Sequence, residues 1–230
     1  MTMLTAQKTP FSERPFYSDS EIERTCTTEL SWQSLLPTFA SPIRIDRFIE
    51  KRFKLVPTYE DLGDGVLGLT RFTAHGVAEI AISRRLDDEV GRVSERRIRT
   101  TLAHEAGHCL LHAHLFTLAT KEHSLFGDFA DPLRPKILCR EKITKYGYHG
   151  DWWEYQANRA MSSLLMPKEL TIDAAEQFLE TRGFLGMRFL APAKKHEAVR
   201  QLAETFDVNP IVAQIRLETL FPEVEGQISL

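Results

Sequence analysis

The feature that most constrains the fold is a His-Glu-x-x-His motif formed by His104, Glu105 and His108. It lies in the stretch Glu95 to Phe116, which is apolar on nearly all sides and is therefore predicted to be a buried helix. Residues four apart share one face of a helix, so the two imidazoles can bind one metal ion, with Glu105 beside it as a general base. The alternative is a pair of core histidines that bind only polar groups of the protein.

A catalytic zinc ion usually has three protein ligands and one open position, so the two histidines need a third partner. His114 has the spacing of an extended zincin motif, but that motif has a helix-breaking Gly where this chain has Leu111. An unbroken helix directs His114 away from the ion. His112 continues the stripe of histidines but lies roughly 12 Å from His104 along the helix axis, too far for one zinc.

Glu154 is the better candidate for the third ligand. It lies near the start of a second predicted helix, which follows Asp151 and ends before Pro167. A carboxylate from this helix would complete a His-His-Glu site, and Asn158, one turn later, could orient a ligand imidazole by a hydrogen bond. The alternative is that Glu154 only closes a capping box with Asp151. Spacing alone does not decide between these two roles.

Length, charge and cysteine content exclude few functions. The 230 residues suffice for one domain with a substantial core, and a formal net charge of -3 gives no general basis for binding nucleic acid or membranes. Residues 1–9 lack the pattern of a signal peptide and no run is as apolar as a membrane span, so a cytoplasmic location is expected. Cys26, Cys109 and Cys139 fit neither a disulfide framework nor a cysteine-based zinc site.

Three segments are predicted along the chain. Residues 1–42 form a loosely ordered extension with a short helix near Glu29 to Leu36, residues 43–167 form the core, and residues 168–230 form a helical segment packed on it. The core begins with a short amphipathic helix after Ile43 and an edge strand over Lys54 to Tyr59.

Two strands, Val66 to Phe72 and Val77 to Ser83, are predicted to form a hairpin in this core. The second strand is expected to receive an extended peptide along its free edge. The arginine-rich stretch Arg84 to Arg99 is expected to be a solvated connector.

About thirty residues after Phe116 show no clear periodicity, as is typical of a lid or a binding loop. They include Tyr146, Tyr148 and His149, which are candidates to stabilise a transition-state oxyanion because they lie close to Glu154 in sequence. A purely structural role is the alternative for each of them.

The C-terminal segment is predicted to contain helices over Thr171 to Thr181, Ala193 to Phe206 and Pro210 to Leu220. The last two have helix-turn-helix spacing, but Arg216 is the only cation of the final helix. Phosphate contacts need several Lys or Arg, so we expect this pair to pack on the core and direct DNA binding to be unlikely.

Two helical motifs resemble the ImmA/IrrE family of metallo-endopeptidases. They are Arg99-Thr100-Thr101-Leu102-Ala103-His104-Glu105-Ala106-Gly107-His108, and Trp153-Glu154-Tyr155-Gln156-Ala157-Asn158 followed by Leu164-Leu165-Met166-Pro167. The resemblance extends from about Ile43 to Phe221. The chain departs from the family at Thr100, often aromatic in its members, and at Arg159, where Phe is common; neither is a proposed ligand.

The resemblance implies a zincin-like α+β fold, in which a small, mainly antiparallel sheet packs on the motif helix and on the helix that carries the glutamate. It also implies zinc ligands at His104, His108 and Glu154, with Glu105 as the catalytic glutamate. Family members typically cleave a helix-turn-helix repressor, so the expected activity is zinc-dependent hydrolysis of peptide bonds in such a protein. The competing hypothesis is a DNA-binding regulator or toxin-antitoxin component with a structural zinc site.

Overall fold

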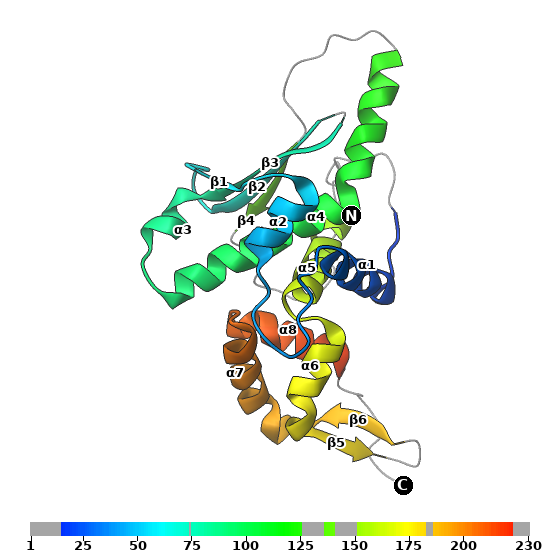
Figure 1. Cartoon of the computed structure of the whole chain (residues 1–230), viewed down its shortest axis with the longest axis vertical. Coiled ribbons are helices and arrows are strands. Elements are labelled where there is room, and N and C mark those ends of the chain that lie inside the picture. Colours follow the sequence, from blue (N-terminus) through cyan, green and yellow to red (C-terminus); the bar gives the residue numbers. More distant parts are fainter. Residues whose placement is uncertain (1–14, 74, 126–135, 141–150, 183–185, 223–230) are drawn as a thin grey trace, which may run out of the picture.

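The computed structural model describes residues 15–73, 75–125, 136–140, 151–182 and 186–222. Over these residues the chain has an α+β architecture, in which eight α-helices accompany a four-stranded sheet and a separate two-stranded hairpin (Figure 1). None of the described helices combines the length and the apolar character needed to cross a bilayer.

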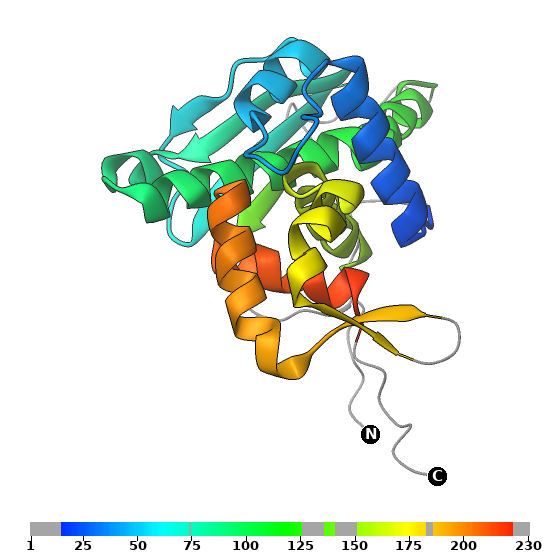
Figure 2. The ribbon, with the colours of Figure 1, turned by 60° about the horizontal axis from the view of Figure 1, so that its bottom comes forward.

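The long helix α4 (Arg92–Leu125) is the middle layer of the molecule. The sheet packs on one side of α4, and α5 (Trp152–Leu165) packs along another (Figure 2). Every residue from Thr100 to Cys109 is buried, as expected for a helix covered on several sides. The predicted helix over Glu95 to Phe116 is therefore confirmed, and it is longer at both ends.

The strands of the main sheet are β1 (Thr58–Glu60), β2 (Val66–Thr73), β3 (Gly76–Ser83) and β4 (Lys136–Arg140), in the order β1-β3-β2-β4. β2 pairs antiparallel with β3 and with β4, whereas β1 pairs parallel with β3. The predicted hairpin is confirmed, and the short strand before it begins at residue 58 rather than 54.

The prediction that Val77 to Ser83 lies at the edge of the sheet is wrong. β3 pairs with β2 on one side and, over Ala81 to Ser83, with β1 on the other. The order of strands depends on which strand the short β1 segment pairs with, and the periodicity of a single strand does not predict that pairing. The edges of the sheet are β1 and β4.

The N-terminal part of the described chain is more ordered than its composition suggested. Helix α1 (Asp19–Trp32) replaces the short helix expected near Glu29 to Leu36, and a capping box between Ser18 and Glu21 begins it. Ile22, Cys26 and Leu30 lie one turn apart and are buried in the core against α5. Helix α2 (Ile45–Phe53) follows and matches the predicted amphipathic helix.

The arginine-rich stretch is mostly exposed up to Glu95, as expected for a solvated connector, but its last residues are not. It forms the short helix α3 (Arg84–Asp88) and the first turns of α4. The Arg96 side chain is only 9% exposed and donates to Asp207 at 2.9 Å, and Arg99 donates to both the carboxylate and the backbone oxygen of Asp207. These bonds attach the turn before the last helix to α4.

The C-terminal segment contains α6 (Lys168–Ala175), β5 (Leu179–Arg182), β6 (Met187–Leu190), α7 (Lys195–Phe206) and α8 (Pro210–Leu220). The helix expected over Thr171 to Thr181 ends at Ala175, and the chain continues as a 3-10 turn and then as β5. The last two helices lie where the sequence predicted them. Their buried residues join the core that also contains residues of α1, α4 and α5.

Candidate metal centre

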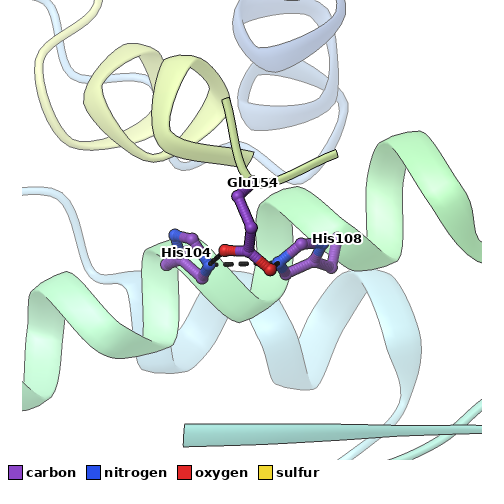
Figure 3. A group of neighbouring side chains, drawn as sticks. All are labelled: His104, His108 and Glu154. Carbon is purple, nitrogen blue, oxygen red and sulfur yellow. Dashed lines mark hydrogen bonds and ion pairs between the residues drawn. The ribbon is translucent and has the colours of Figure 1, made fainter. Parts of the chain in front are cut away.

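Two histidines of α4 and one glutamate of α5 point toward one another (Figure 3). The Nε2 atoms of His104 and His108 are 3.0 Å apart. Glu154 places Oε2 at 3.1 Å from the first Nε2 and Oε1 at 3.5 Å from the second. A tetrahedral ion with bonds of about 2.0 to 2.1 Å holds its ligand atoms roughly 3.3 Å apart, so these three side chains could hold a metal ion.

The position of Glu154 depends on a close contact between α4 and α5. A Cβ atom at Gly107 would lie 3.0 Å from both the Ala157 carbonyl oxygen and the Ala160 Cβ. Any larger residue would push the two helices apart, so Gly107 lets α5 approach near enough for its glutamate to reach the histidines. Asp151, the N-cap of α5, makes no side-chain capping bond, so the capping-box alternative for Glu154 is not what the structure has.

The protonation states at this site suit a cation. Burial lowers the pKa of His108, so its imidazole is neutral at neutral pH. Burial alone would raise the pKa of Glu154, but the adjacent His108 and the hydrogen bonds with His104 and His108 outweigh it and hold the pKa well below its usual range. Neutral imidazoles and an ionised carboxylate are the forms that bind metal.

Each ligand imidazole has a partner at its second ring nitrogen. His104 Nδ1 lies 3.0 Å from Asn158 Oδ1, the contact expected from the sequence. His108 Nδ1 lies 3.0 Å from Nδ1 of His112, whose Nε2 lies 3.0 Å from Gln156 Oε1. The sequence argument excluded His112 as a ligand on distance, and the structure places it behind His108 instead.

Glu105 faces the sheet. Successive helical residues are about 100° apart, so this side chain turns from the ligand face toward β2. Thr70 donates a hydrogen bond to Glu105 Oε2 at 2.5 Å. A Cβ atom at Gly68 would lie 2.6 Å from Glu105 Oε1, so the carboxylate occupies room that only glycine leaves.

One oxygen of the Glu105 carboxylate, Oε1, accepts no hydrogen bond from the described residues. It is completely buried, and burial raises its pKa to about 7 against the lowering effects of His104 and Thr70. Within the described part of the chain, Glu105 Oε1 is the one buried side-chain nitrogen or oxygen atom without a hydrogen-bond partner. A buried unpartnered oxygen is uncommon in a folded protein, and a catalytic role is one of its known explanations.

Other predicted residues do not join this site or cannot be placed in it. His114 is exposed and is not part of the ligand group. Tyr146, Tyr148 and His149 lie outside the described residues. Gly68 and Thr70 were not predicted as site residues, because the pattern of a strand does not show which helical residue the strand will face. A supporting role for Gln156 could have been suspected from the sequence, because it lies on the same predicted helix between Glu154 and Asn158.

No model of a known protein family matches the chain, and no curated protein matches it either. One fold can host unrelated activities, so function depends on the side chains of the site. The residues that bear on it are His104, Glu105, His108 and Glu154.

Proposed function

We propose that the chain is a zinc-dependent endopeptidase with a zincin-like core, as its resemblance to the ImmA/IrrE family implies. One observation carries the proposal. A buried carboxylate with an unpartnered oxygen, Glu105, is adjacent in sequence to a three-ligand donor group, His104, His108 and Glu154. Among the residues that the structure describes, three ligands meet here, and three ligands would leave one coordination position open, which is typical of catalytic zinc, whereas structural zinc sites have four protein ligands.

The donor set suits zinc, which binds imidazole nitrogen and carboxylate oxygen in tetrahedral geometry. When bound, zinc lowers the pKa of a coordinated water and polarises a peptide carbonyl. Glu105 would accept a proton from the attacking water and deliver it to the leaving amine, the role of a positioned general base and acid. Thr70 and Gly68 hold the carboxylate in place for this transfer.

An extended peptide substrate would add to the sheet at β4. This strand is the edge next to β2, which carries Thr70, whereas β3 pairs with β2 and, over Ala81 to Ser83, also with β1. Backbone hydrogen bonds to an edge strand give affinity with little sequence preference. The family resemblance suggests a helix-turn-helix repressor as the protein substrate.

The test compares the unaltered protein with Glu105→Gln. The amide keeps the shape of the side chain but cannot act as a base, so the variant should bind zinc normally and cleave about 10² to 10⁴ times more slowly. Both proteins would be expressed in cells, and mass spectrometry would compare the new N-termini that appear on a helix-turn-helix repressor encoded beside the gene and on all other proteins. Zinc content of the purified proteins is measured in parallel.

Undiminished cleavage by the zinc-loaded Gln variant would remove Glu105 from the mechanism. An absence of any cleavage that depends on Glu105, together with unfolding on removal of zinc, would favour a structural zinc site and thus the regulator hypothesis.

A further inference from the structure

The third histidine of the stripe extends the metal centre beyond its ligands. His112 lies 3.0 Å from His108 through Nδ1 and 3.0 Å from Gln156 Oε1 through Nε2. The Gln156 amide nitrogen donates to the backbone oxygen of Pro15 at 2.9 Å. A continuous chain of contacts thus leads from a metal ligand to the segment that precedes α1.

The hydrogen positions in this chain follow from the ligand geometry. His108 faces His104 and Glu154 through Nε2, so binding of a metal at these three side chains would require the lone pair on Nε2 and the hydrogen on Nδ1. His112 Nδ1 must then accept, which leaves the hydrogen on its Nε2 to be donated to Gln156 Oε1. Each hydrogen bond in this series is therefore donated in the direction away from the metal. Each acceptor, from His112 to Gln156 and Pro15, has a donor on the preceding residue.

The acceptor at position 112 is held in one orientation by packing. The His112 side chain is completely buried, and its ring meets the Trp152 ring edge to face, at 5.6 Å between centroids. Trp152 packs in turn with Phe72 and Leu115 in a small apolar cluster. The packed His112 ring cannot rotate freely, so it fixes the orientation of the His108 imidazole that donates a hydrogen bond to it.

We propose that His112, Gln156 and the Pro15 carbonyl hold His108 in the tautomer and orientation that zinc binding requires, and so couple zinc affinity to the segment before α1. This inference rests on the proposed zinc site and concerns its affinity rather than cleavage. The two ligand histidines are held differently: Asn158 holds His104 directly, whereas the support of His108 ends on the backbone of another segment. Displacing that segment would loosen one ligand and leave the other in place.

The test measures zinc affinity, by competition with a chromophoric chelator, in His112→Phe and His112→Asn. Phe keeps the ring but has no acceptor, and loss of such an outer partner typically weakens metal binding 10 to 100-fold. Asn carries Oδ1 on Cγ, where His carries Nδ1, so it should recover most of the affinity. Gln156→Leu, which leaves His112 in place but cuts its link to Pro15, should weaken binding by a smaller factor.

Two further measurements separate positioning from general stability. The thermal midpoint of each metal-free variant reports folding, and the absorption spectrum of the cobalt-loaded protein reports ligand geometry. His114→Phe, at an exposed position on the same helix, is the control and should change neither the thermal midpoint nor the cobalt spectrum. Zinc affinity unchanged in both His112→Phe and Gln156→Leu would overturn the inference alone, whereas failure of the unaltered protein to bind zinc would overturn the proposed function and the inference together.

Discussion

Glu154 is the residue that decides whether His104 and His108 belong to a metal centre or are only a pair of buried histidines. Glu154→Gln removes the anionic ligand with almost no change in shape, so we expect the purified variant to lose stoichiometric zinc while its metal-free form folds normally. His114→Ala should keep its zinc, because that side chain is exposed and apart from the ligand group. Metal analysis after dialysis checks both, and the reverse pattern would refute the ligand assignment.

The two histidines were predictable from the sequence because positions 104 and 108 share a face in any α-helix. Spacing alone left two roles open for Glu154, and the family resemblance made it the expected third ligand. The supporting residues were not predictable. Thr70 meets Glu105 across 35 positions of sequence, and Gly68 and Gly107 matter only because another backbone or side chain approaches them closely.

At the scale of elements, most helices and the β2–β3 hairpin followed from periodicity, whereas α3, β4, β5 and β6 were not predicted and neither was the pairing of the elements. The length of α1 was missed because its buried apolar residues are only Ile22, Cys26 and Leu30, spaced among polar ones. Strand β3 was expected at an edge because pairing with β1 depends on a distant segment. The arginines at the start of α4 suggested a solvated connector, because the sequence does not show that an acidic residue of a distant turn, Asp207, lies next to Arg96 and Arg99.

That acidic turn yields a prediction about pH. Burial alone would raise the pKa of Asp207, but hydrogen bonds from Arg96, Arg99 and Arg92 outweigh it and lower the pKa from 3.8 to about 2. The carboxylate therefore stabilises the fold above about pH 4 and loses this effect as the pH falls toward 2. A lowering of this size corresponds to about 2 kcal/mol of folding free energy.

Asp207→Asn should therefore lower the free energy of unfolding by about 2 kcal/mol at pH 7. The difference from the unaltered protein should shrink between about pH 4 and pH 2. Asn tolerates the left-handed backbone at this position, where φ is 51°, so the change isolates the charge. Urea unfolding at several pH values checks this, with Asp64→Asn as a control whose side chain is 93% exposed. A difference that does not depend on pH would show that the ion pairs are not its cause.

At the scale of the whole molecule, one buried arginine joins three parts of the chain. Arg216 of α8 donates to Glu23 of α1 at 2.6 Å, to the Met166 carbonyl oxygen at 2.7 Å and to Ser163 of α5 at 3.2 Å. Glu23 also accepts from the backbone nitrogen of Lys168. The final helix is thus fastened to the α1 and α5 layer by polar bonds as well as by the shared core.

The same contacts bear on the competing hypothesis of a DNA-binding helix-turn-helix. Arg216 is the only cation of α8, and its side chain is 2% exposed and already paired, so it is not available to a phosphate. Recognition helices present several Lys or Arg to the duplex, and the apolar face of α8 is instead buried against the rest of the protein. The packing of the last helix therefore favours a structural role.

Arg216→Met should consequently act on stability. Removing one partner of a buried ion pair leaves the other charge uncompensated, so we expect the free energy of unfolding to fall by about 3 to 5 kcal/mol. Arg200→Met, at an exposed position of α7, is the matched control and should change stability by less than about 0.5 kcal/mol. Denaturant unfolding of both variants gives these values, and retention on duplex DNA at physiological salt is measured alongside. If Arg216→Met kept its stability but lost a salt-dependent affinity for DNA that the unaltered protein possessed, the final helix would be a recognition helix, and the regulator hypothesis would replace the one proposed here.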